Sequence, residues 1–229
     1  MTDTNPATSS PAAYAAWNEE MVRRYDIERY YAQSHPLIRW LEKRRLDVLA
    51  ALAAAAPGER VLEVGCGAGH VLARFPQAER VGLDLSPTML ERARRRLGPQ
   101  VPLHHGSADS LPFADGTFDV VLCTEVLEHT PEPTVVLREL LRVAGSKGRV
   151  VVSVPNENRI DAAKRGLSRI PGLRALLRTL ASEENEWHLH RMDLPFLRNM
   201  CAGAARIERV RALPWAPLPL RYAARLRAL

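Results

Sequence analysis

Short apolar runs alternate with amphipathic stretches through the middle of the 229-residue chain. Apolar runs that end at glycine or proline predict buried strands, whereas apolar positions spaced by three and four predict helices. The predicted strands are residues 60–64, 80–85, 101–105, 118–124, 149–154 and 206–213. The predicted helices begin near Gly69 or cover residues 87–97, 132–143 and 193–202. Because strands that alternate with helices form βαβ units, the pattern predicts an α/β fold with a doubly wound, mostly parallel sheet.

The two ends of the chain depart from this rhythm. Residues 1–20 lack the basic and apolar blocks of a signal peptide, and we expect them to be disordered. Residues 21–56 carry apolar positions at helical spacing and predict one or two leading helices. A basic amphipathic insertion over residues 157–190 predicts a helical lid, and the tail from Pro214 predicts a loop and a final short helix. Residues 21–229 then form a single domain.

Positive charge is concentrated in the last third of the chain. The net charge is +6, and residues 156–229 alone carry +7. Within residues 159–180, Lys164, Arg165, Arg169, Arg174 and Arg178 lie beside a leucine stripe, which is typical of a peripheral membrane contact or a clamp on a lipid-like acceptor. A second interpretation stays open, in which the leucines pack on the sheet and the arginines are solvated. Nucleic acid is not expected, because no aromatic residues interleave the charge.

The location of the protein is indicated by its apolar runs and its cysteines. The longest apolar run, residues 46–56, is far shorter than the roughly 20 residues that cross a bilayer. Cys66, Cys123 and Cys201 show no CxxC spacing, which argues against a disulfide framework and a thiolate zinc site. We therefore expect a cytoplasmic protein with reduced thiols.

A glycine-rich turn between the first predicted strand and the next element carries the main chemical signal. Gly65, Gly67 and Gly69 would let the backbone approach a ligand closely. Glu63 stands two residues before the first glycine, and Asp84 closes the next strand, 19 residues after Gly65. A carboxylate at that point can accept hydrogen bonds from both hydroxyls of a ribose, so the spacing predicts a nucleoside-containing cofactor.

Four stretches together resemble the class I S-adenosylmethionine-dependent methyltransferases, especially the small-molecule subgroup. They cover roughly residues 60–156 and are VLEVGCGAG, VGLDLSPTML, GSADSLPFADGTFDVVLCTEVLEHTPEP and LRELLRVAGSKGRVVVSVPN. The resemblance implies the Rossmann-like fold of that family, with seven strands, and S-adenosylmethionine as the cofactor. It further implies methyl transfer to a small-molecule or lipid-like acceptor, at oxygen rather than nitrogen.

The resemblance also implies which residues bind the methyl donor. From the methionine end to the adenine end they are Glu63, Gly65, Cys66, Gly67, Thr124, Asp84, Leu85, Met89, Asp109 and Ser110. Within this set Asp84 would hold the ribose, and Leu85 with Met89 would flank the adenine. Asp109 with Ser110 would meet the amino group of the adenine.

The spacing ExxEH after the fourth predicted strand groups Glu125, Glu128 and His129 beside the expected methyl group. It is similar to the metal-binding stretch of the ubiquinone-pathway O-methyltransferases, where a further histidine completes the site. His188 or His190 of EWHLHRMD would supply that ligand, and Mg²⁺ is the cation we expect. The metal-free alternative makes His129 a base or positioning group and leaves Glu125 at the donor, so both residues are candidate catalytic groups.

Two other classes of function remain to be weighed. A nicotinamide-dependent oxidoreductase would also use Asp84, but its GxGxxG spacing from Gly65 needs glycine where this chain has His70. The charge of Glu63 would moreover repel a pyrophosphate. The second alternative is a regulator with the methyltransferase fold that binds the cofactor without turnover.

Overall fold

The computed structural model describes residues 10–25, 35–167 and 187–229 of the chain. Its centre is a seven-stranded sheet in the order β3-β2-β1-β4-β5-β7-β6. The strands are β1 (Arg60–Val64), β2 (Glu79–Asp84), β3 (Leu103–His105), β4 (Val120–Thr124), β5 (Arg149–Pro155), β6 (Ala205–Trp215) and β7 (Leu218–Ala228). Strands β1 to β5 pair in parallel, and β7 runs antiparallel to both of its neighbours. The expected doubly wound, mostly parallel α/β sheet is therefore confirmed.

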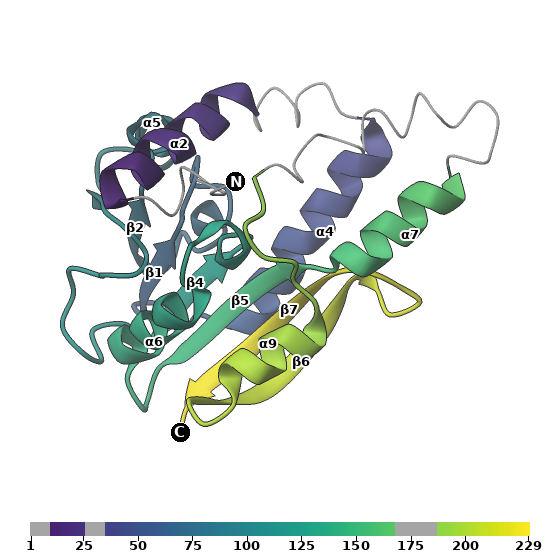
Figure 1. Cartoon of the computed structure of the whole chain (residues 1–229). Coiled ribbons are helices and arrows are strands. Elements are labelled where there is room, and N and C mark those ends of the chain that lie inside the picture. The colour runs from purple at the N-terminus through teal and green to yellow at the C-terminus, as the bar shows by residue number, and fades with distance from the viewer. Residues whose placement is uncertain (1–9, 26–34, 168–186) are drawn as a thin grey trace.

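Helices cover both faces of this sheet (Figure 1). They are α2 (Pro11–Arg24), α4 (Pro36–Ala53), α5 (Pro87–Leu97), α6 (Pro133–Ala144), α7 (Glu157–Leu167) and α9 (Leu194–Cys201). Strand residues alternate between two apolar clusters: Leu62 packs with residues of α6 and α9, whereas its neighbour Val61 packs with Leu49 of α4. Since side chains of a strand point alternately to the two faces, this alternation lets one sheet bury two helical layers.

Proline and a polar cap define where several helices begin. Ser86 precedes Pro87 of α5 and its hydroxyl accepts the amide of Met89 at 3.1 Å. Asp193 caps α9 in the same way by accepting the amide of Phe196 at 2.8 Å. Proline fits the first helical turn because that turn leaves its amides unbonded, and the cap accepts one of the remaining amides. None of the described helices is long and apolar enough to cross a membrane.

Our expectation of disorder over residues 1–20 is wrong for the residues that the structure describes there. Helix α2 begins at Pro11, where the hydroxyl of Ser10 accepts the amide of Ala13 at 3.1 Å. Met21 and Val22 of this helix are buried in a cluster with residues from distant parts of the chain. That burial supplies the free energy that an isolated helix of this length lacks. Residues 1–9 lie outside the described residues.

Two further expectations about single elements are wrong. Instead of a helix from Gly69, the chain forms one 3₁₀ turn, Leu72–Arg74, since Pro76 keeps the residue before it out of the helical region. Instead of a final helix, the tail forms β7, whose Ala224 and Leu226 are buried in the core. Alanine, arginine and leucine favour helices, but the gap between β5 and β6 offers this segment backbone partners on both sides.

The structure describes only part of the expected leading helices and of the expected lid. Helix α4 lies within the expected leading helices over residues 21–56, and α7 opens the expected lid over residues 157–190. Residues 168–186, which hold most of that lid, lie outside the described residues.

Candidate active site

The glycine turn after β1 has a backbone that only glycine adopts easily. Gly65 and Gly67 have φ values of +69° and +50°. A Cβ atom on Gly65 would lie 2.3 Å from a methyl carbon of Val126, so a larger residue cannot fit there. At Gly67 a Cβ atom would meet nothing within 4 Å. The turn is therefore packed against the protein at its first glycine and open to a ligand at its second.

Asp84 ties the end of β2 to this turn. Its Oδ2 accepts the amide of Gly67 at 2.7 Å, and its Oδ1 accepts the amide of Ser86 at 2.8 Å. Burial raises the pKa of Asp84, and the two amide donors act against that rise. Because each carboxylate oxygen has two lone pairs, both oxygens can accept one more hydrogen bond, as two ribose hydroxyls would supply.

Glu63 and Cys66 support the turn from inside the protein. Oε2 of Glu63 accepts the amide of Leu72 at 2.9 Å, and burial raises the pKa of this carboxyl to about 8. Burial also raises the pKa of the Cys66 thiol, so the reactive thiolate is disfavoured. Glu63 is thus held below the turn as a positioning residue, and Cys66 is a small buried residue.

The expected adenine-side residues occupy three different environments. Met89 is buried beside Trp187, whereas Leu85 is half-buried and its carbonyl accepts a hydrogen bond from His105 Nε2 at 2.9 Å. Asp109 and Ser110 are exposed on the loop after β3.

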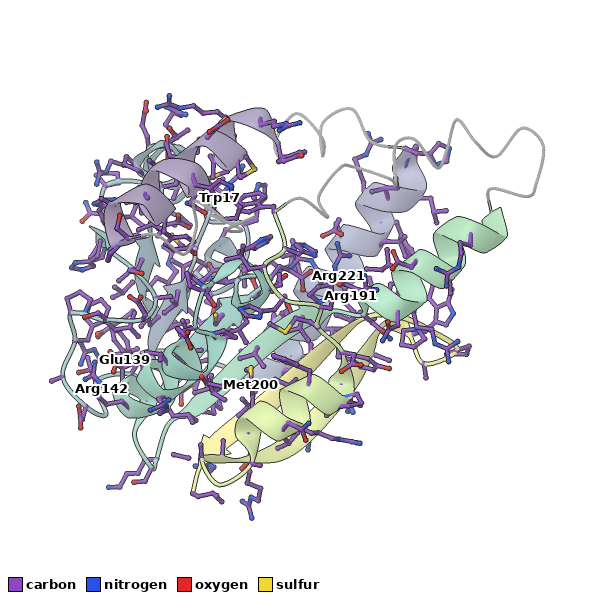
Figure 2. The ribbon with its side chains drawn as sticks, viewed as in Figure 1. Trp17, Glu139, Arg142, Arg191, Met200 and Arg221 are labelled. Carbon is purple, nitrogen blue, oxygen red and sulfur yellow. The ribbon has the colours of Figure 1, made fainter. Side chains whose placement is uncertain are left out.

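That loop is held by one arginine of α6. Arg142 donates to the carbonyls of Leu111 and Phe113 at 3.0 and 2.7 Å, and Figure 2 shows it beside Glu139, its ion-pair partner on the same helix. These contacts fix the chain directly after Ser110. Asp109 and Ser110 are therefore attached to a segment whose backbone is held in place. Thr124 is buried at the carboxyl end of β4.

Helix α2 lies over residues that we expect to bind the donor, and sequence reasoning missed it. The hydroxyl of Tyr14 donates to the carbonyl of His129 at 3.2 Å, and burial together with Asp109 and Asp84 raises the pKa of this phenol. Trp17 points from α2 toward the body of the domain (Figure 2). A cap at Ser10 followed by aromatic residues at positions 14 and 17 was the sequence signal for this helix.

Glu19 fastens α2 to the start of α5. Its carboxylate accepts the hydroxyl of Ser86 at 2.5 Å and also the hydroxyl of Thr88. We expect Glu19→Ala to loosen α2 and to speed dissociation of S-adenosylhomocysteine severalfold, because each such bond to a charged group contributes about 1.5–3 kcal/mol before solvent screening. Stopped-flow release measures this rate. Glu20→Ala, an exposed neighbour on α2, is the matched control, and equal rates in both variants would refute the role of Glu19.

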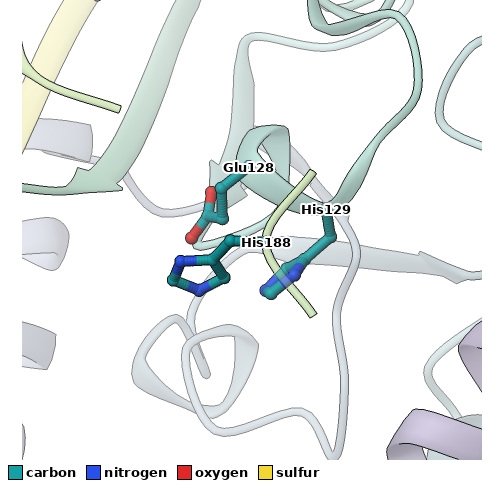
Figure 3. Close-up of side chains that lie close together, drawn as sticks. All are labelled: Glu128, His129 and His188. Atoms are coloured by element: carbon teal, nitrogen blue, oxygen red, sulfur yellow. The ribbon is translucent and has the colours of Figure 1, made fainter. Parts of the chain in front are cut away.

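The ExxEH stretch brings three potential ligands together, as Figure 3 shows. One ligand atom from each of Glu128, His129 and His188 lies within 4.8 Å of the other two. Nδ1 of His129 donates to the carbonyl of Trp187 at 3.1 Å, and Nδ1 of His188 lies 2.7 Å from a carboxylate oxygen of Glu157. Since the Nδ1 atoms are occupied, both histidines present Nε2 as the free lone pair.

Burial shapes the charge of this cluster. Glu128 is 1% exposed, and its Oε2 has no hydrogen-bond partner among the described residues. Burial, and then the charge of Glu125, raises the pKa of Glu128 well above its ordinary value. Burial, and then His188, lowers the pKa of His129 to about 3. The unpartnered carboxyl oxygen and the neutral imidazole are therefore suited to receive a cation or a hydroxyl group.

Glu125 does not join this cluster, which corrects our expected ligand set. Among the described residues, the grouped ligand atoms are those of Glu128, His129 and His188, and Glu125 is not one of them. Its carboxylate instead accepts from Ser153 Oγ and from Arg221 Nε, each at 2.8 Å. Sequence reasoning missed Arg221 because it lies on β7, in the tail where we expected a helix.

His190 is also directed elsewhere. Its Nε2 lies 3.0 Å from the carbonyl of Pro131, and His190 is not part of the ligand group that the described residues form. The structure therefore selects His188 rather than His190 as the downstream histidine of the cluster.

Comparison with known proteins agrees with this fold. Residues 62–152 match a family model described as a methyltransferase domain. A ubiquinone biosynthesis O-methyltransferase from Hahella chejuensis is 32% identical over 176 residues, which cover 74% of this chain and 70% of the relative. A demethylmenaquinone methyltransferase from Renibacterium salmoninarum is 36% identical over 145 residues, which cover 62% of this chain and 59% of that relative.

Among solved structures, the magnesium protoporphyrin IX methyltransferase of Synechocystis with bound S-adenosylhomocysteine has a TM-score of 0.69 at 17% identity. It covers 96% of this chain, and this chain covers 100% of it. At that identity the likeness shows the fold alone, which is the Rossmann-like fold of the expected class. The fold, the glycine turn and the sequence relatives together place the chain in the family of class I S-adenosylmethionine-dependent methyltransferases.

Proposed function

We propose that the protein transfers the methyl group of S-adenosylmethionine to an oxygen atom of a small, lipid-like acceptor. One observation carries the proposal: the donor residues and the cluster of Glu128, His129 and His188 lie under the same helix. The hydroxyl of Tyr14 on α2 donates to the carbonyl of His129, and burial, then Asp109 and Asp84, raises the pKa of the Tyr14 phenol, which supports a position near both groups of residues. The names of the relatives, which belong to ubiquinone and menaquinone enzymes, support an acceptor of that class.

Methyl transfer requires that donor and acceptor are aligned, and a hydroxyl acceptor must also lose its proton. The sulfonium already activates the methyl group, so the protein has to hold donor and acceptor in line. The cluster is where the structure gathers groups able to help remove the proton. Glu63, Gly65 and Gly67 would then serve the donor, while Glu128 and His188 would serve the acceptor.

We propose that Glu128, His129 and His188 hold a divalent cation. The carboxyl of Glu157 on His188, and the carbonyl of Trp187 on His129, orient the two rings as outer partners of metal-binding histidines commonly do. A cation would supply the positive charge that the buried Glu128 needs, and it would lower the pKa of a bound hydroxyl. Two imidazoles and one carboxylate favour Mn²⁺ or Zn²⁺ over the Mg²⁺ expected from the sequence.

In the metal-free alternative, a histidine accepts the proton of the acceptor hydroxyl. The pKa of about 3 makes His129 a weak proton acceptor. His188 is better placed, because Glu157 at 2.7 Å would stabilise the imidazolium that forms. In this case His129 would position the acceptor, and Glu125 would act through its ion pair with Arg221.

The experiment that tests the function follows the methyl group. The purified protein is incubated with methyl-labelled S-adenosylmethionine and a lipid extract that contains hydroquinones and catechols. We expect label in an organic-soluble product and an equal amount of S-adenosylhomocysteine. Donor binding without either product would favour the regulator instead, and labelled protein or amine products would refute the oxygen acceptor.

We also propose peripheral membrane contact through residues 159–180 and a cytoplasmic location. The contact is supported by the basic leucine-rich composition of this segment, of which only the first part is described. The location is supported by the three cysteines, which are all free and buried. The variant Arg165→Glu tests the contribution of this segment to vesicle binding.

A further inference from the structure

Exposed apolar side chains gather where the N-terminal half of α4 meets the β6–β7 hairpin. Among the described residues, the exposed large apolar side chains are Leu37, Trp40, Trp215 and Leu229, and the first three lie at this place. Leu37 and Trp40 are three residues apart on α4 and share one face of the helix. The rings of Trp40 and Trp215 lie 6.3 Å apart. We call Leu37, Trp40 and the hairpin turn Trp215–Pro217 the tryptophan surface.

The hairpin turn has an unusual composition for an exposed turn. Residues 213–220 read LPWAPLPL and contain no polar side chain. Trp215, Ala216 and Pro217 are nevertheless exposed. Exposed hairpin turns usually carry glycine, asparagine or aspartate, which suit both the backbone and water. An apolar turn that stays exposed indicates that something other than water covers it.

Basic residues surround the tryptophan surface. Lys43 and Arg44 are exposed on the same half of α4. Arg44 lies 6.0 Å from the ring centre of Trp40, and its Nε donates to the carbonyl of Pro214 at 2.8 Å, so it holds the hairpin against the helix.

The acidic residues of this part of α4 are already neutralised by ion pairs. Glu42 pairs with Arg45 and Arg221, and Asp47 pairs with Arg74. Among the described residues, the exposed rim of the tryptophan surface is therefore positive, and it complements a negatively charged partner.

We propose that the tryptophan surface docks on an anionic phospholipid bilayer. Tryptophan rings favour the boundary between headgroups and acyl chains, and basic residues beside them pair with lipid phosphates. The surface is distinct from residues 159–180, and the inference does not depend on the acceptor proposed above. It also lies close to the site, because Glu42 of α4 bonds Arg221, which bonds Glu125. Docking would hold the catalytic edge near the membrane.

Vesicles of equal parts phosphatidylcholine and phosphatidylglycerol test this surface. We expect the full chain to float with them at low salt, and the Trp40→Ser, Trp215→Ser double variant to bind about tenfold more weakly or worse. Leu229→Ser, at the exposed C-terminus, is the matched control and should bind like the original chain. Lys43→Glu should weaken binding more than Lys147→Glu, which makes the same charge change on an exposed loop elsewhere. Thermal melting confirms that the variants fold.

Quenching by brominated lipid then locates the contact. The chain has four tryptophans, and we expect quenching of Trp40 and Trp215. A Trp40→Phe, Trp215→Phe double variant should therefore keep most of its binding and lose most of its quenching. No flotation at low salt would overturn the inference, as would wild-type binding by the serine double variant. Loss of binding in Arg165→Glu alone would assign the contact to the lid. A dimer without vesicle binding, abolished by the serine variant, would show that a second copy covers the surface.

Discussion

Replacing Asp84 by asparagine should weaken the binding of S-adenosylmethionine on the order of 100-fold or more. The carboxylate accepts the amides of Gly67 and Ser86, and we expect it to accept two ribose hydroxyls as well. Charge-assisted hydrogen bonds contribute about 1.5–3 kcal/mol each, and an amide of the same shape can replace only part of them. The loss should fall on S-adenosylhomocysteine too, since the ribose is common to both. Isothermal calorimetry measures both affinities.

The control for this variant is Asp47→Asn. Asp47 is an exposed aspartate that pairs with Arg74 on the protein surface, and such pairs contribute little to stability. This variant should bind the donor like the original chain. Unchanged donor affinity in Asp84→Asn would contradict the position of the ribose, and tight binding of a nicotinamide dinucleotide would contradict the cofactor.

Replacing Glu128 by glutamine should abolish cation binding and lower turnover on the order of 100-fold. The carboxyl of Glu128 is buried without a hydrogen-bond partner for its Oε2, and it is the only acidic member of the cluster with His129 and His188. An amide cannot supply the negative charge that a divalent cation requires. Paramagnetic resonance of Mn²⁺ measures binding without reference to activity, and donor affinity should change little.

A control variant and a chelator experiment distinguish loss of the cation from a general loss of structure. Glu132→Gln changes an exposed carboxyl four residues further along the chain, and it should leave cation binding and turnover unchanged. A chelator should stop turnover by the original chain, and added Mn²⁺ should restore it. Turnover that resists the chelator, with no Mn²⁺ bound, would remove the cation and leave His188 with Glu157 as the proton-accepting pair.

The inner part of the fold could be predicted because its signals are local. The helix expected over residues 87–97 begins and ends where α5 does, since the cap at Ser86 and the glycine at position 98 both lie beside it. The tail could not be predicted in this way. Its Ala223 and Arg225 favour a helix by propensity, and only pairing with β5 and β6 makes the segment a strand.

The candidate site likewise contains residues that the sequence predicts and residues that it does not. Asp84 follows from its spacing to Gly65, and both lie within one βαβ unit. Tyr14 reaches the carbonyl of His129 across 115 positions, and Arg221 reaches Glu125 across 96. No periodicity in the sequence records such contacts, because they depend on how distant elements pack. The expected grouping of Glu125 with Glu128 failed for a related reason, since the carboxylate of Glu125 accepts hydrogen bonds from Ser153 on β5 and Arg221 on β7.

A crystal structure of the protein with S-adenosylhomocysteine would show most directly whether donor and acceptor meet at this edge of the sheet. We expect both ribose hydroxyls within hydrogen-bond distance of Asp84, the adenine near Asp109, and the sulfur directed toward the cluster of Glu128, His129 and His188. A ligand bound away from the glycine turn, or with its sulfur directed away from that cluster, would contradict a meeting of donor and acceptor at this edge of the sheet.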